Sequence, residues 1–219
     1  VVLEQGKALP NAGAYKDYFR WVATGLEEPM TTHADRFKYN TGYGMSAYDK
    51  GSIFLSQLQY VIGKENFDNT LKRYFDDWSF KHPKPNDFIR SAEKVSGLEL
   101  DWYLLDWAQS TMTIDYSVNS LYGVDNKTRI VLKRIGQMGM PIDLRVKLKS
   151  GETLDYNIPM TKMRGSKPLQ SSTLLKSWSW AKPYYEVWLD IDSKNISKIT
   201  IDPKNEMADI NRDNNYLVL

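Results

Sequence analysis

The sequence predicts an α+β protein in two parts, a helical bundle-like segment followed by a small antiparallel β-sandwich. Apolar residues recur at helical spacing through the first half of the 219-residue chain, and they alternate with polar residues after about Thr111. Apolar residues make up 42% of the chain and aromatic residues 13%, which is enough to build a real core. We therefore expect a helical part at residues 1–112 and a β-sandwich with a polar C-terminal tail at residues 113–219.

Helical periodicity marks five segments of the first part. The first covers residues 15–24 and should end near Gly25. The second carries Leu55, Leu58, Val61 and Ile62 on one stripe, and Gly63 is well placed to stop it. The others are residues 67–78, residues 88–95 after an N-cap at Asn86 or Asp87, and residues 98–107 with Leu98, Trp102 and Leu105 inward. The helices on either side of Gly63 should pack as an antiparallel pair.

Alternation with a period of two residues marks the strands of the second part. Residues 144–148 alternate apolar with basic, and a turn at Ser150-Gly151 leads into residues 154–158, so this stretch predicts a hairpin with one solvent-facing side. The same alternation recurs at residues 114–118, 130–132, 185–191 and 199–201. Residues 163–177, rich in Ser, Lys and Pro, are expected to form a long loop.

Composition narrows the chemistry and the partners. The 29 Lys and Arg residues are interspersed with 27 Asp and Glu residues, so nucleic acid is not an expected partner. No apolar run approaches the ~18 residues that a membrane helix needs. The chain has no Cys, and His33 and His82 are too far apart to form a His-x-x-x-His pair, so no metal site is expected within it. A Cys-free chain does not fix the compartment.

Several short motifs follow one another in the order seen in a known family. The acidic stretch at residues 27–35 precedes Tyr43, Tyr48-x-Lys50-Gly51 opens a helix, and Gly63-x-Glu65-Asn66-Phe67, Pro85-x-Asp87-Phe88 and Ser96-Gly97-Leu98 follow downstream. This order resembles the zinc aminopeptidases of the aminopeptidase N and leukotriene hydrolase group. The resemblance covers roughly residues 14–135, and the ends of the chain near residues 201–203 and 209–211 resemble the tails of bacterial relatives.

The resemblance also implies what this chain lacks. The family's His-Glu-x-x-His helix, its further zinc-ligating Glu and its Gly-x-Met-Glu-Asn strand are absent from these residues. With a start at Val1 rather than Met, we expect a C-terminal portion of a zinc metallopeptidase that is inactive alone. Zinc is then expected in the full-length protein rather than in this chain, the zinc-binding half of the same protein is the expected partner, and a peptide is the expected substrate.

Tyr48 occupies the position of the family's catalytic tyrosine. In the family, that tyrosine donates a hydrogen bond to the oxyanion that forms when a zinc-bound water attacks the peptide carbonyl. A phenol suits this role because its pKa of ~10 keeps it protonated at neutral pH, and because its rigid ring can hold the hydroxyl in a fixed direction. From pattern alone, Tyr48 would more often be a core tyrosine, because it lies 7 and 14 residues before Leu55 and Ile62 on a helical stripe, and it is the resemblance that favours the catalytic role. Tyr43 also has a counterpart in the leukotriene hydrolase branch, and we expect it to support the site indirectly.

Other candidate residues each have a simpler interpretation. Trp178, Trp180 and Tyr184 could form an aromatic face of a non-catalytic protein- or glycan-binding module, although such aromatics more often belong to a sandwich core or an interface. His33 more often would be a loop histidine than a ligand. Glu27-Glu28, before a proline, would usually lie in solvent. Asp209-x-Asn211-x-Asp213 has the first spacings of a calcium loop but lacks its Gly and its Glu.

Overall fold

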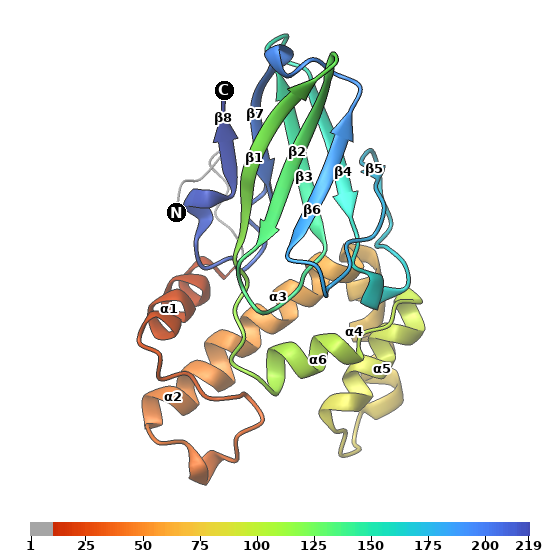
Figure 1. Ribbon diagram of the computed structural model, residues 1–219. Helices are drawn as coiled ribbons and strands as arrows, with labels where there is room; N and C mark the ends of the chain where they lie inside the picture. Colours follow the sequence, from red (N-terminus) through yellow and green to blue (C-terminus); the bar gives the residue numbers. More distant parts are fainter. Residues whose placement is uncertain (1–10) are drawn as a thin grey trace. The chain divides into compact units, whose positions relative to one another are not determined.

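The chain divides into two compact units in a computed structural model that describes residues 11–219. In the described residues, the helical unit comprises residues 11–112 together with Lys204–Ala208, and the β unit comprises Thr113–Pro203 together with Asp209–Leu219. Helices fill the first unit and strands the second, which confirms the α+β fold class (Figure 1).

The helical unit contains six α-helices in its described residues. They are α1 (Ala12–Ala23), α2 (Asn40–Gly44), α3 (Gly51–Ile62), α4 (Lys64–Trp78), α5 (Pro85–Ser96) and α6 (Asp101–Ala108). A 3-10 turn, η2 (Ala34–Arg36), lies between α1 and α2. A π-helical turn, η3 (Met45–Lys50), joins α2 to α3 with helical backbone angles on both sides, so Asn40 to Ile62 form one continuous helix.

The core of the helical unit is built around α3 and α6. The buried apolar side chains there come from α1, α3, α5, α6 and the residues just before α6, and include Tyr18, Ile53, Leu58, Ile89, Leu100, Tyr103 and Trp107. α4 packs mainly against α5 rather than back along α3, so the antiparallel pair expected around Gly63 is not the main contact. Gly63, at φ 84° and ψ 154°, is the only residue between the two helices.

Two details of the predicted helices are wrong. The helix predicted at residues 88–95, α5, begins at Pro85 rather than after an N-cap at Asn86 or Asp87, because proline suits the first helical position. The Asp87 side chain accepts a hydrogen bond from the Lys84 amide (2.7 Å). Leu105 is exposed rather than inward, since α6 spans eight residues and turns Trp102 and Trp107 into the core instead. Gly63 and Gly97, both at positive φ, end their helices as predicted.

The β unit contains two sheets. The strands are β1 (Tyr116–Val124), β2 (Lys127–Arg134), β3 (Ile142–Leu148), β4 (Thr153–Ile158), β5 (Thr173–Leu174), β6 (Tyr184–Leu189), β7 (Ile196–Ile201) and β8 (Tyr216–Val218). One sheet has the order β1-β2-β6 and the other β5-β4-β3-β7-β8, and Figure 1 shows them as two layers. The predicted hairpin is β3–β4, with Leu144 opposite Tyr156 and Val146 opposite Leu154.

The inner faces of the two sheets form the core of the β unit. Ile130, Leu132 and Val187 are buried on one sheet, and Leu144, Val146 and Ile199 on the other. One pairing departs from the antiparallel prediction, because the two-residue β5 runs parallel to β4 within the expected loop at residues 163–177.

The segment after Pro203 is not simply a polar tail. Lys204–Ala208 belongs to the helical unit, where Met207 and Ala208 are fully buried. The fully buried Gln57 side chain of α3 holds this segment, donating to the Glu206 carbonyl (2.7 Å) and accepting from the Ala208 amide (3.0 Å). The chain then returns to the β unit, where β8 pairs with β7. The backbone carbonyl of Glu206 and the backbone amide of Ala208 therefore find their hydrogen-bond partner in a side chain from the first half of the sequence.

The helices of residues 11–219 are all too short or too polar to serve as membrane-spanning segments.

Candidate functional site

Tyr48 lies on the π-helical turn and points outward. Its side chain is 74% exposed, and it has no hydrogen-bond partner among the described residues. The interpretation as a core tyrosine is therefore wrong. The predicted stripe does not follow the buried face of the helix: Leu55 is also exposed (39%), and only Ile62 of the three residues is fully buried.

The opposite side of the π-helical turn is buried and polar. Ser46 and Lys50 are 3% and 2% exposed, and they lie four residues apart, so they share one face of the turn while Tyr48 lies between them on the other. Lys50 Nζ donates to Glu27 Oε1 (2.5 Å) and to the Ser110 carbonyl (3.2 Å). Ser46 Oγ reaches the Glu28 carbonyl at 3.5 Å, the long limit of a hydrogen bond.

Glu27 and Glu28 are anchors rather than solvated acids, which corrects the expectation for this pair. The Glu27 side chain is 6% exposed and forms an ion pair with Lys50. Glu28 Oε2 accepts a hydrogen bond from the Lys38 amide (3.1 Å), which connects Glu28 to the loop before α2. Burial raises the pKa of Tyr18, whose hydroxyl has no partner in the described structure, and the Glu27 carboxylate adds to the rise. Glu27 is therefore surrounded by buried groups of α1 and η3.

Ser110, the second partner of Lys50, is held in place by the end of α6. Its hydroxyl donates to the Asp106 carbonyl and accepts from the Met112 amide. Lys50 thus links the π-helical turn to two separate segments, the loop at Glu27 and the residues that follow α6. Sequence reasoning missed this role, although a lysine at the head of the apolar α3 was a signal that its charge needs a buried partner.

The charge beside Tyr48 is carried by Asp49. Partial burial and the Asp17 carboxylate of α1 raise the pKa of Asp49. Asp17 itself is paired with Arg20 on α1 (3.6 Å). The outer side of the turn therefore presents a phenol next to a carboxylate whose charge is disfavoured.

Tyr43 differs from Tyr48 in its surroundings. It lies on α2, is 43% exposed, and packs its ring edge-on against Phe37 with 5.7 Å between ring centroids. A supporting contact between Tyr43 and Tyr48 does not appear among the described interactions, so the indirect role of Tyr43 stays a prediction.

The described residues do not fit a zinc site. No three side chains of His, Asp or Glu come together within residues 11–219 to hold a metal ion. His33 caps η2, because its Nδ1 accepts from the Asp35 amide (3.3 Å), and His82 is exposed in the loop before α5. Any zinc that acts with Tyr48 would need ligands from outside this part of the chain.

The three aromatic residues proposed for a binding face are not brought together on one strand. Trp178 is buried, with its ring 5.4 Å from Tyr116 and 5.3 Å from Tyr185, and its indole nitrogen donates to the Lys182 carbonyl. Trp180 is half-exposed in a turn under the Lys162 ammonium, and Tyr184 is half-exposed on β6. The prediction of a shared face is wrong because residues 178–180 leave the strand conformation after a single bridge.

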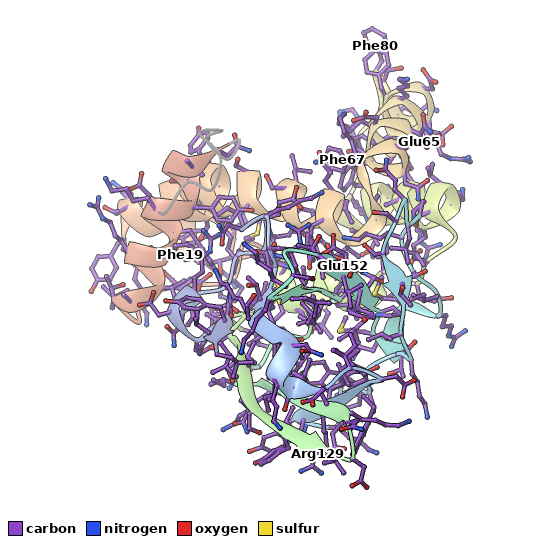
Figure 2. The ribbon with its side chains drawn as sticks, turned by 90° about the horizontal axis from the view of Figure 1, so that it is seen from above. Phe19, Glu65, Phe67, Phe80, Arg129 and Glu152 are labelled. Atoms are coloured by element: carbon purple, nitrogen blue, oxygen red, sulfur yellow. The ribbon has the colours of Figure 1, made fainter. Side chains whose placement is uncertain are left out.

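A different aromatic row lies on the β1-β2-β6 sheet. Arg129 of β2 places its guanidinium 4.7 Å from the Tyr122 ring of β1 and 5.8 Å from the Trp188 ring of β6 (Figure 2 labels Arg129). The three residues are cross-strand partners on one face of the sheet. Because Arg129 already contacts both rings, cation–π stabilisation of the sheet explains this row without a ligand.

Asp209 is a buried structural carboxylate rather than a calcium ligand. It is 0% exposed, and its oxygens accept from the Tyr116 amide (2.8 Å) and the Asn211 amide (2.9 Å). Burial raises its pKa to about 7, against the lowering effect of these hydrogen bonds, and the Asp115 carboxylate adds to the rise.

Residues 16–107 match the family model described as the Peptidase family M1 domain. Aminopeptidase N of Escherichia coli (strain K12) is 25% identical over 71 residues, which is 32% of this chain, and glutamyl aminopeptidase of Rattus norvegicus is 31% identical over 83 residues, which is 38% of this chain. The match spans 8% of the length of each of these curated relatives.

The fold is also similar to a solved structure. The crystal structure of Legionella pneumophila aminopeptidase A in complex with aspartic acid aligns with a TM-score of 0.53 and 16% sequence identity, covering 77% of this chain and 18% of that chain. At this identity the likeness concerns the fold. The family-model match and the two curated relatives support a relationship to M1 aminopeptidases for the helical unit, and the residues matched by the family model include the whole π-helical turn.

Proposed function

We propose that this chain is the portion of an aminopeptidase-like metallopeptidase that supplies the oxyanion-stabilising tyrosine, Tyr48, together with part of the wall of the substrate cleft. It acts with a zinc-binding portion of the same protein and has no peptidase activity by itself. Two findings support the proposal: the M1 match over residues 16–107, and the short share, 8%, of each curated relative that this match spans.

The observation that carries the proposal is the exposure of the Tyr48 side chain. A bulky aromatic residue that is 74% exposed contributes little to the core, so packing does not explain it. Its neighbours Ser46 and Lys50 are buried and bonded, so the turn is fixed while the phenol remains free to meet a ligand. A fixed donor is what oxyanion stabilisation needs, because it costs no reorganisation when the charge develops.

The role of Tyr48 in this proposal is confined to its hydroxyl. The neutral O–H donates a hydrogen bond to the carbonyl oxygen of a peptide substrate as that oxygen gains negative charge. The bond is stronger to the developing oxyanion than to the ground-state carbonyl, so it lowers the barrier more than it improves substrate binding. Zinc chemistry is not assigned to any residue of this chain.

Tyr48→Phe in the full-length protein tests the proposal. Loss of the hydroxyl should lower kcat by roughly 10²- to 10³-fold. KM should change little, because ground-state binding does not depend on this donor. The melting temperature should stay within about 1 °C of the wild type, since an exposed hydroxyl without a partner contributes almost nothing to folding. Steady-state kinetics with an aminoacyl reporter substrate and thermal melting measure the three quantities.

Two comparisons keep this test specific. Tyr43→Phe is the matched control and should cost clearly less, because the Tyr43 ring packs on Phe37 and its ring remains. Residues 1–219 alone should give no turnover of the same reporter. If Tyr48→Phe keeps near-normal kcat while Tyr43→Phe loses it, Tyr43 is the catalytic tyrosine; if neither variant is impaired, the proposed role is wrong.

A further inference from the structure

The π-helical turn is held from its inner side by charge. Lys50 and Glu27 have side chains that are 2% and 6% exposed, and their ion pair measures 2.5 Å. Desolvating two charges is expensive, and a buried ion pair is often no more stable than an apolar pair of the same size. A pair in this position is therefore poorly explained by fold stability alone.

The geometry of the pair offers another explanation. Lys50 is the last residue of η3 and lies two positions after Tyr48, on the opposite side of the turn. Its ammonium has two acceptors on two different segments, Glu27 and the carbonyl of Ser110, so it fixes both the rotation of the turn and its depth. Apolar packing is not directional, and it would let the turn slip toward an ordinary α-helical register. In that register Tyr48 would point elsewhere.

We infer that Lys50 and Glu27 are positioning residues: their buried ion pair holds the π-helical turn in the register that directs the Tyr48 hydroxyl outward. The inference rests on the proposed role of Tyr48 for its catalytic consequence, but its structural part concerns only the turn. Neither residue needs to touch the substrate.

The test replaces the pair as a unit in the full-length protein. Glu27→Leu together with Lys50→Met removes both charges at similar volume and leaves no buried charge unpaired, so the protein should still fold. The matched control applies the same two replacements to the exposed i,i+4 pair of α4, Asp68→Leu with Lys64→Met. Thermal melting of both variants checks that the fold is retained.

The first readout does not depend on activity. Amide hydrogen exchange of residues 45–51 should become at least roughly tenfold faster in the Glu27→Leu, Lys50→Met variant, while α4 and α5 keep their wild-type rates. The control variant should leave residues 45–51 unchanged. Unchanged exchange at residues 45–51 in the pair variant overturns the inference.

The second readout is a kinetic cycle with Tyr48→Phe. Loss of the pair should lower kcat by roughly 10- to 100-fold with KM within about twofold, as expected for a misplaced donor. Added to Tyr48→Phe, loss of the pair should cost no more than about a further twofold, because both changes remove the same interaction. Fully additive losses overturn the inference. If Tyr48→Phe alone is without effect, the proposed function fails, and hydrogen exchange then decides the inference by itself.

Discussion

The carboxyl group of Asp209 illustrates how one side chain can make the stability of the β unit depend on pH. Its pKa is raised to about 7 in the folded chain, mainly by burial, against ~3.9 for an unperturbed Asp. Between about pH 4 and pH 7 the folded state therefore binds the proton more tightly than the unfolded state does. The free energy of unfolding should fall as pH rises through this window and stay level above it.

We predict a loss of stability of a few kcal/mol between pH 5 and pH 8 that depends on Asp209, since one pKa unit corresponds to about 1.4 kcal/mol. Asp209→Asn removes the titration and should flatten the profile. Asn offers one acceptor oxygen where Asp209 accepts from two amides, so the variant should also be less stable at pH 5. Urea denaturation across pH 5–8 measures both effects.

Asp213→Asn is the matched control for this profile. Asp213 lies four residues further along, in η6 (Arg212–Asn214), and its side chain is exposed. Its replacement should leave the slope unchanged. An equal slope in the wild type and in Asp209→Asn would show that Asp209 ionises normally.

At the scale of the helices, three glycines differ in whether their backbone conformation requires glycine. Gly63 links α3 to α4 at φ 84° and ψ 154°, a region open almost only to glycine. Gly97 ends α5 at φ 71° and ψ 12°, the left-handed region, which other residues enter at a smaller cost. Gly44 has helical angles, and a Cβ there would meet nothing within 4 Å.

Replacing each of these glycines by Ala should therefore give three different results. Gly63→Ala should destabilise the protein by roughly 1–3 kcal/mol and Gly97→Ala by about 1–2 kcal/mol, with Gly63→Ala the larger. Gly44→Ala should stabilise it by up to about 1 kcal/mol. Urea denaturation ranks the variants. A loss at Gly44 as large as that at Gly63 would mean that the flexibility of Gly44 is needed by the π-helical turn.

The elements also show what the sequence could predict. Local period identified most helices and strands, because burial on one face repeats every few residues. It could not predict η3, since one extra residue in a turn leaves no mark in composition, and the stripe through Tyr48 and Ile62 assumed an uninterrupted helix. Tyr48 was reached through family resemblance. The ion pair that Lys50 forms with Glu27, 23 residues earlier, depends on tertiary structure, so local sequence periodicity could not predict it.

At the scale of the whole molecule, α4 and the turn that follows it present an uncovered apolar surface. Leu71 is 41%, Phe75 68% and Phe80 103% exposed, and Figure 2 shows the Phe80 ring projecting outward. Phe80 also has φ 61°, which is unfavourable for a bulky residue. Exposed apolar residues grouped at one end of a helix and in the turn after it favour association.

We therefore expect reversible self-association of the chain at high concentration. Phe75→Gln with Phe80→Gly should abolish it, and should not lower stability, because Gly relieves the positive φ at position 80. Tyr48→Ser, which removes an equally prominent aromatic away from α4, is the control and should change nothing. Sedimentation over a hundredfold range of concentration distinguishes the variants. A wild-type chain that stays monomeric throughout would contradict the expectation.

The segment Lys204–Ala208 has a consequence for how the protein is made on the ribosome. The helical unit needs this segment to satisfy Gln57 and to fill the positions of Met207 and Ala208. Those residues are translated only after the strands from β1 to β7. The first half of the chain thus emerges before its own core can close. The helical unit can therefore finish folding only after residue 208 has been translated, although its helices are translated before the strands of the β unit.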